Sequence, residues 1–255
     1  MIVEYHRPDT IEEALRLLQR ETPRTSPMGG GTVLNRPSPD PLAVVDLQNL
    51  GLSRIERRGN SLLVGATVTL QSLLDTAGLQ PALGRAILHE ATHNLRQSAS
   101  LAGTLVAAGG RSPLAAALLA LDTELELASP GGKREKMGLG DLLPLRGELL
   151  RGRLITGLTV PLNARLAYEY VARTPADLSI VCAAAAQWPA GRTRLVLGGF
   201  GASPMLVVDG PEAAGAEQAA RDAYSQAEDE WASAEYRQEM ASVLTRRCLQ
   251  DLAEN

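Results

Sequence analysis

The chain has 255 residues, of which 45% are hydrophobic and only 3% aromatic, and its formal net charge is −4 at pH 7. This length suits one large or two modest domains, with a core built mainly from Leu, Val, Ala and Ile. No run of Lys and Arg stands out, so nucleic acids and anionic membrane surfaces are not expected as partners.

The cysteines and the most apolar stretch indicate in which cellular compartment the protein is expected and whether it spans a membrane. Cys182 and Cys248 are the two cysteines, and they match no metal-binding or redox spacing. No signal-peptide pattern begins the chain, so we expect free thiols in a reducing cytoplasm. Residues 101–121 are interrupted by glycines, an arginine and a proline, so no segment is expected to span a membrane.

The first 50 residues predict a β-α-β unit. Residues 2–6 read as a short strand, and Thr10 with Glu13 forms a capping box for a helix over residues 11–20. A second short strand should follow this helix. The apolar run 42–47 predicts a buried strand.

A run of three glycines follows the second of these strands, in Ser26-Pro27-Met28-Gly29-Gly30-Gly31-Thr32-Val33-Leu34. Glycine permits positive φ and lets a ligand approach the backbone closely. Successive free N–H groups in such a turn suit a phosphate or pyrophosphate. The spacing matches neither G-x-G-x-x-G nor the P-loop, so a tight turn without a ligand stays open as an alternative.

The next part of the chain predicts a hairpin, several helices and strong strands. The small, polar residues 96–104 form a second candidate ligand loop at the exit of a helix. The predicted elements in order are a hairpin of strands 53–57 and 61–65, helices 70–76 and 81–95, helix 114–121, strand 123–128, a turn at 130–134 and strand 154–161.

The composition changes after Pro161, and we place a domain boundary near Asn163. The remainder predicts a small α+β domain with a sheet and two helices. Its predicted elements are strands 167–172, 180–187 and 193–198 and helices 212–227 and 234–252.

His89-Glu90-Ala91-Thr92-His93 matches H-E-x-x-H, a zinc-hydrolase pattern. On one helix, both histidines would share a face and Glu90 could act as general base. The only other histidine is His6, and no third ligand stands at a recognisable spacing. We therefore keep zinc hydrolysis only as a remote alternative to a surface helix with two solvated histidines.

Together these landmarks resemble one family along nearly the whole chain, the FAD-binding medium subunit of the molybdenum hydroxylases, which include carbon monoxide dehydrogenase and xanthine dehydrogenase. No single motif decides this resemblance, but their order and spacing make it specific. The matching stretches are Gly29-Gly30-Gly31-Thr32, Val45-Asp46-Leu47, Val64-Gly65-Ala66-Thr67-Val68-Thr69, Ala99-Ser100-Leu101-Ala102-Gly103-Thr104, 117–122 and Ser233-Ala234-Glu235-Tyr236-Arg237.

The resemblance implies an α+β fold. Residues 1–162 would form an FAD-binding domain of the vanillyl-alcohol-oxidase type, with subdomains of about 1–52 and 53–162. Residues 163–255 would form a C-terminal domain with a three-stranded antiparallel sheet and helices. The implied cofactor is FAD, its pyrophosphate between the two loops and its flavin near Ile155 and the cleft between domains. The implied cofactor-binding residues are Met28, Gly29, Gly30, Gly31, Thr32, Val33, Leu34, Ser100, Ala102, Gly103, Thr104 and Ile155.

The resemblance also implies the role and the partners. Such a subunit does not oxidise the organic substrate. It takes electrons from a small [2Fe–2S] subunit, associated with a large molybdopterin subunit, and passes them to NAD, oxygen or another acceptor. Two cysteines cannot hold the iron–sulfur clusters in this chain, which agrees with that division of labour.

Several positions depart from the family pattern, including Glu169, Tyr170 and Val171, where a basic residue is expected. Ala99 and Ala102 replace glycines, Thr104 replaces an asparagine, and Pro113 or its neighbours replace an aspartate. An added methyl group would narrow the approach of a phosphate. A scaffold subunit that keeps the fold and has lost the cofactor is therefore the main alternative.

Overall fold

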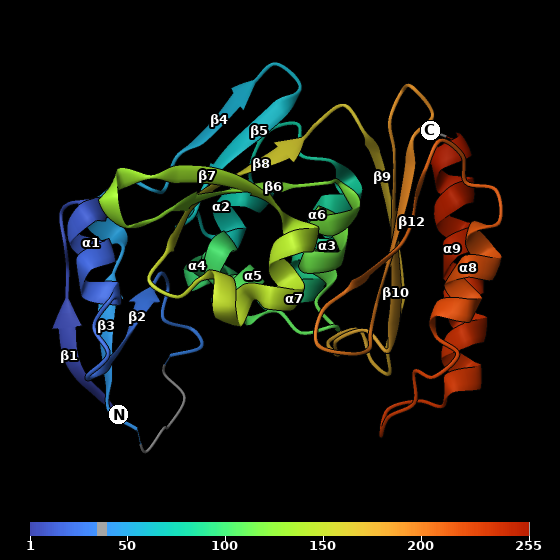
Figure 1. Ribbon diagram of the computed structural model, residues 1–255. Coiled ribbons are helices and arrows are strands. Elements are labelled where there is room, and N and C mark those ends of the chain that lie inside the picture. Colours follow the sequence, from blue (N-terminus) through green and yellow to red (C-terminus); the bar gives the residue numbers. More distant parts are fainter. Residues whose placement is uncertain (35–39, 255) are drawn as a thin grey trace. The chain divides into compact units, whose positions relative to one another are not determined.

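The computed structural model describes residues 1–34 and 40–254 (Figure 1). The chain folds into two compact units. Unit 1 comprises Met1–Asp75, His93–Ala107 and Glu124–Val160. Unit 2 comprises Thr76–Thr92, Ala108–Thr123 and Pro161–Asn255, so two segments from before the boundary expected near Asn163 pack with the C-terminal strands.

Unit 1 contains two sheets. The first has the strand order β1-β3-β2, with β1 (Ile2–His6), β2 (Arg24–Met28) and β3 (Leu42–Asp46) all parallel. The second has the order β4-β5-β8-β6-β7, built from β4 (Ile55–Arg58), β5 (Ser61–Gly65), β6 (Glu124–Ala128), β7 (Arg134–Gly138) and β8 (Leu154–Pro161). The helices of the unit are α1 (Ile11–Leu18), α2 (Leu70–Leu74), α4 (His93–Ser98), α5 (Leu101–Ala107) and α7 (Leu139–Leu149).

The β-α-β unit forms as its sequence predicts. Thr10 caps α1 by accepting the amide of Glu13 at 3.2 Å, and the helix buries Ala14, Leu15 and Leu18. The apolar strand β3 lies in the middle of its sheet because it is buried on both faces. β2 ends at Met28, opposite Asp46, and the glycine run leaves the sheet at that point.

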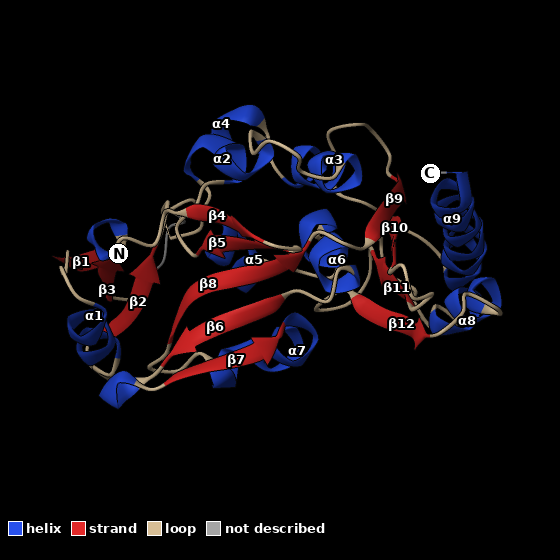
Figure 2. Ribbon diagram, turned by 90° about the horizontal axis from the view of Figure 1, so that it is seen from above, coloured by secondary structure: helices blue, strands red, loops and turns tan. Residues whose placement is uncertain are grey.

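Unit 2 is a four-stranded antiparallel sheet between two layers of helices. The strand order is β12-β11-β10-β9, with β9 (Arg165–Val171), β10 (Val181–Gln187), β11 (Thr193–Gly198) and β12 (Met205–Gly210). Figure 2 shows α8 (Ala216–Ala223) and α9 (Ala234–Glu254) on one face, with α3 (Pro81–Glu90) and α6 (Pro113–Ala120) on the other.

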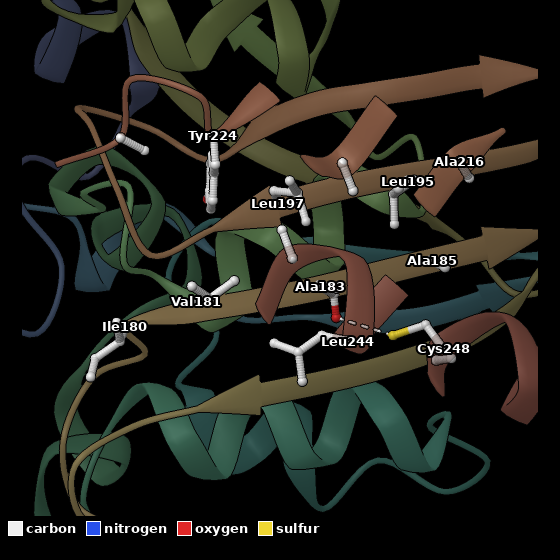
Figure 3. Close-up of a cluster of buried hydrophobic side chains, with 14 of the residues drawn as sticks. Ile180, Val181, Ala183, Ala185, Leu195, Leu197, Ala216, Tyr224, Leu244 and Cys248 are labelled. Carbon is white, nitrogen blue, oxygen red and sulfur yellow. Dashed lines mark hydrogen bonds between the residues drawn. The ribbon is translucent and has the colours of Figure 1, made fainter. Parts of the chain in front are cut away.

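The alanines of β10 allow helices to pack on both faces of this sheet. Side chains alternate between the faces of a strand, so Ala183 and Ala185 face α8 and α9 in the buried cluster of Figure 3. The thiol of Cys248 on α9 lies 3.4 Å from the carbonyl oxygen of Ala183. Every residue of α6, which packs against β10 and β11, is buried. Small side chains on the strand therefore bring both helical layers close.

The structure confirms the β-α-β unit, the hairpin 53–65 and the strands of the C-terminal domain, and it corrects several details. The C-terminal sheet has a fourth strand, β12, where three were predicted. The helix predicted over residues 81–95 is two helices, α3 and α4. β7 and α7 were not predicted, because residues 130–134 read as a turn and Pro144 interrupts the helical pattern. The helix predicted over residues 212–227 is limited to α8.

Arg237 on α9 should contribute strongly to the stability of unit 2. Its fully buried side chain donates to the carbonyl oxygens of Ile180 and Gly199 and to the carboxylate of Asp229, at 2.6 to 2.7 Å. We expect Arg237→Ala to lower the free energy of unfolding by about 3–5 kcal/mol, because it leaves buried acceptors without a donor. Urea denaturation measures this.

The exposed Arg247 on the same helix offers the matched control. Arg247→Ala should change the free energy of unfolding by less than about 0.5 kcal/mol. Arg237→Lys keeps the positive charge, but the lysine ammonium group has fewer N–H donors than the planar guanidinium group. The free energy of unfolding of this variant should therefore lie between those of wild type and Arg237→Ala. Equal stabilities of the two alanine variants would contradict the role given to Arg237.

Candidate functional site

The glycine run forms a turn that opens at the end of β2. The carbonyl oxygen of Met28 accepts the amide of Leu47 at 3.0 Å, as the last bond between this chain segment and the end of β3. Gly29 and Gly30 then bend away from the sheet, and Gly31 has a φ of +70°. In residues 1–34 and 40–254, no acceptor pairs with the backbone amides of Gly29, Gly30 or Gly31. This turn therefore presents three adjacent N–H donors.

The second predicted loop is largely helical. Leu101, Ala102, Gly103 and Thr104 form the first turn of α5, and Ser100 precedes it. The hydroxyl oxygen of Ser100 accepts the amide of Gly103 at 3.3 Å, and the carbonyl oxygen of Ser100 accepts the hydroxyl of Thr104 at 2.9 Å. Ser100 thus caps a helix where the sequence suggested an open loop.

The structure brings the two predicted segments into contact. A Cβ atom added to Gly29 would lie 2.2 Å from the hydroxyl oxygen of Ser100. One added to Gly30 would lie 1.5 Å from the carbonyl oxygen of Ser98. Gly103 is constrained in the same way, since its Cβ would lie 2.7 Å from the Ser100 hydroxyl. Gly29 and Gly30 are therefore required for the packing of one segment on the other, while Gly103 leaves room for the Ser100 hydroxyl within the second segment.

Ile155 lies in β8, and its side chain is buried. The next residue in the strand, Thr156, is connected to the first turn of α5 through hydrogen bonds with Ala66. The carbonyl oxygen of Thr156 accepts the amide of Ala66, and the carbonyl oxygen of Ala66 accepts the amide of Ala102, at 3.1 and 3.2 Å. The first turn of α5 is thereby held to the strand that contains Ile155.

The remaining predicted residues complete the turn after the glycines. Thr32 and Leu34 are half-buried, while Val33 is exposed. They lie at the end of the described range 1–34 and belong to unit 1 like the rest of the predicted site.

Sequence reasoning missed the residues that support the site through their main chain. The carbonyl oxygens of Ser98, Ala66 and Val68 all face the two segments, and Val68 accepts the amide of Leu101 at 2.8 Å. A carbonyl group is present in every residue, so no side-chain pattern marks these positions. Gly65, the residue before Ala66, was an indirect sign that the backbone is closely packed here. A Cβ atom added to Gly65 would lie 2.0 Å from the carbonyl oxygen of Leu52.

The H-E-x-x-H stretch does not form a metal site. α3 ends at Glu90 because Ala91 is extended, so His89 and His93 do not share one helix. Both ring nitrogens of His89 are engaged, one with the hydroxyl of Tyr168 and one with the carbonyl oxygen of Asp177, each at 2.8 Å. Within the described residues, no group of three or more His, Cys, Asp or Glu side chains is arranged to hold a metal. The helical premise of the zinc alternative was wrong.

Glu90 has a structural role instead. Its carboxylate accepts the hydroxyl of Ser112 at 2.7 Å and the amide of Leu114 at 3.0 Å, at the start of α6. Ser112 in turn caps α6 by accepting the amide of Ala115. The carboxylate therefore joins the end of α3 to the beginning of α6.

The comparisons with known proteins agree with this geometry. A family model described as the FAD binding domain in molybdopterin dehydrogenase matches residues 1–163. The chain belongs to this family. The Escherichia coli (strain K12) protein YgfM, named as uncharacterized, is 29% identical over 251 residues, covering 96% of this chain and 94% of YgfM. The nicotine 6-hydroxylase medium subunit of Paenarthrobacter nicotinovorans is 28% identical, covering 97% of this chain and 96% of that protein.

Solved structures share the fold of the whole chain. A crystal structure of the Cu,Mo-CO dehydrogenase in its cyanide-inactivated form superposes with a TM-score of 0.83 at 23% identity, covering 98% of this chain and 97% of that one. The family match confirms the resemblance inferred from the sequence. Residues 1–163 are therefore an FAD-binding domain of the kind found in molybdopterin dehydrogenases, which are oxidoreductases.

The residues present fit FAD. The turn at Gly29 to Gly31 offers unpaired amides in a backbone arrangement that any larger side chain at Gly29 or Gly30 would disrupt. Adjacent amides of this kind bind the oxygens of a phosphate. Within the described residues, no helix combines the length and the apolar character that a membrane span requires.

Replacing Glu90 should change how stability depends on pH. Burial raises the pKa of the Glu90 carboxyl above its ordinary value of 4.5, while the hydrogen bonds from Ser112 and Leu114 act in the opposite direction. The folded chain holds this proton more tightly than the unfolded chain, so the stabilising contribution is lost as the pH rises through the folded pKa.

We therefore expect the free energy of unfolding of wild type to fall, relative to that of Glu90→Gln, as the pH rises from about 4.5 towards 7. Urea denaturation of both proteins across this range measures the difference. A difference that does not vary with pH would contradict the raised pKa of Glu90.

Proposed function

We propose that this chain is the electron-transfer subunit of a multi-subunit molybdenum hydroxylase. It takes electrons from an iron–sulfur subunit and passes them to an acceptor such as NAD or oxygen. The observation that carries the proposal is the turn of unpaired amides at Gly29 to Gly31, closed against Ser98 and Ser100 inside the region that matches the FAD-binding family. Bound FAD supplies the required chemistry, because it accepts electrons singly and releases them as a pair.

The proposed cofactor-binding residues are those predicted from the sequence. Gly29, Gly30 and Gly31 bind the pyrophosphate, and the flavin ring lies near Ile155. Met28, Thr32, Val33 and Leu34 flank the turn, while Ser100, Ala102, Gly103 and Thr104 form the adjoining segment. We also propose residues 1–162 as the FAD-binding domain and 163–255 as the C-terminal domain. The family match over residues 1–163 supports this boundary.

The proposed partners are a small [2Fe–2S] subunit and a large molybdopterin subunit. The name of the nicotine 6-hydroxylase relative, a medium subunit, supports an assembly of several chains. The cysteines supply a physical argument. Cluster ligands are thiolates, and a [2Fe–2S] cluster usually takes four of them. Cys182 and Cys248 are both buried, and burial raises the pKa of the Cys182 thiol to about 12. The clusters that feed electrons to FAD therefore belong to another chain.

Two further points accompany the proposal. Free thiols at Cys182 and Cys248 favour the cytoplasm as its compartment. The competing function, a scaffold subunit without cofactor, rested on Ala99, Ala102, Thr104 and Pro113. Ala99 and Ala102 are both buried within unit 1.

Absorption spectroscopy and metal analysis test the proposal. We expect an affinity-tagged chain, purified from cells that express the whole assembly, to show flavin absorption bands that survive desalting. Iron and molybdenum should elute with it, because both metals would be held by its partner chains. A chain that stays colourless with excess FAD would overturn the cofactor role. Flavin without any co-eluting iron or molybdenum would overturn the proposed partners.

A further inference from the structure

The connection between β9 and β10 in unit 2 is fixed by side chains that bind its backbone. Four successive carbonyl oxygens, those of residues 177–180, each accept a hydrogen bond from a side chain. The donors are His89 to Asp177 at 2.8 Å, Arg111 to Leu178 and Ser179 at 2.6 and 2.8 Å, and Arg237 to Ile180 at 2.6 Å. These donors come from three separate segments of unit 2, so the backbone of residues 177–180 is held from several directions.

This fixed stretch leaves an apolar side chain at the surface. Leu178 is 42% exposed, although its carbonyl group is bound by Arg111. The same arginine places its guanidinium group over the ring of Trp231, 4.4 Å from the ring centre, and Trp231 is 37% exposed. An apolar side chain on a backbone that is already ordered loses less entropy when a partner covers it. Tryptophan and arginine are also enriched among the residues that dominate binding energy at protein interfaces.

The surface beside Leu178 carries two positive charges on one aromatic ring. The guanidinium group of Arg173 also lies over Trp231, 5.0 Å from the ring centre. Among the described residues, neither Arg111 nor Arg173 forms an ion pair with a carboxylate. Asp177 and Asp229 act on Arg111 from nearby. The Asp177 carboxylate accepts the amide of Thr174, however, and that of Asp229 is paired with Arg237.

The second tryptophan of the chain provides a comparison within the same unit. The guanidinium group of Arg192 lies over Trp188, 5.0 Å from the ring centre. This arginine is also bound to the carboxylates of Asp122 and Asp209, at 2.9 and 2.7 Å. The charge on Trp188 is therefore neutralised within the protein. In the part of the chain that the structure describes, the pair of charges on Trp231 has no such carboxylates, and a partner can supply them.

We propose that the surface formed by Leu178, Trp231, Arg111 and Arg173 is a docking site for a partner subunit that presents a carboxylate beside an apolar side chain. The carboxylate pairs with the guanidinium groups, and the apolar side chain covers Leu178 and Trp231. A small anion would use the guanidinium groups alone and leave Leu178 uncovered, so the exposed leucine favours a protein. This inference rests on the proposed function, because it takes the partner to be a subunit of the proposed assembly.

The test measures how much iron accompanies the chain. The affinity-tagged chain is purified from cells that express the whole assembly, and iron and flavin are determined per mole of chain. Arg173→Glu should lower the iron content at least about fivefold, because it reverses a charge that the partner's carboxylate needs. Leu178→Ser should lower it as well, since it removes the apolar side chain and keeps the carbonyl group that Arg111 binds.

Two substitutions serve as controls. Arg247→Glu makes the same charge reversal at an exposed position of α9 in the same unit. Glu230→Lys makes the opposite change beside Trp231, at an exposed position. Neither should lower the iron content. Circular dichroism reports whether each variant folds, and the flavin content of every variant should match that of wild type because the cofactor is bound elsewhere.

The outcomes separate this inference from the proposed function. Unchanged iron content in Arg173→Glu and Leu178→Ser, with iron present in wild type, would overturn the docking site and leave the assembly intact. An equal loss in Arg247→Glu would show a general effect of charge and overturn the assignment to this surface. A loss in Arg173→Glu alone would overturn the role given to Leu178. Wild type with flavin and no iron would overturn the proposed assembly and this inference with it.

Discussion

The close approach of two backbone segments is the constraint on which the site depends. Gly29 and Gly30 leave β2 and meet Ser98 and Ser100, some seventy positions later in the chain, at distances that exclude any side chain on the glycines. This contact ties the three-stranded sheet to the helical junction between α4 and α5 within unit 1. It also sets the direction of the amides in the turn. Both the packing of the two segments and the exposure of the amides therefore require glycine at positions 29 and 30.

The contact is supported by a relay of main-chain hydrogen bonds. The first turn of α5 donates to Val68 and Ala66, and Ala66 in turn donates to Thr156 of β8. Main-chain hydrogen bonds of this kind are insensitive to side-chain identity, so the arrangement tolerates an alanine at position 102. The five-stranded sheet and α5, both in unit 1, thus support the glycine turn together.

Local sequence patterns predicted much of the fold, but they gave a wrong prediction at the H-E-x-x-H stretch and missed the strand β12. The Thr10 capping box and the apolar run of β3 predicted the β-α-β unit because both signals act within a few residues. The pattern His89 to His93 matched a zinc motif because a motif search ignores the backbone. Ala91 is extended, and Glu90 caps α6. The fourth strand of the C-terminal sheet was missed because β12 follows a run of Gly, Ser and Pro that reads as loop.

The sequence by itself determined the order of elements, the glycine run and the family to which the chain belongs, because these depend on residue types at short spacing. Only the tertiary structure decided why Gly29 and Gly30 must be glycine: the atoms that exclude a Cβ there are Ser100 Oγ and Ser98 O. It also decided which amides stay unpaired, since the acceptors for α5 come from residues 66 and 68. Such contacts join segments distant in the chain, and no local pattern records them.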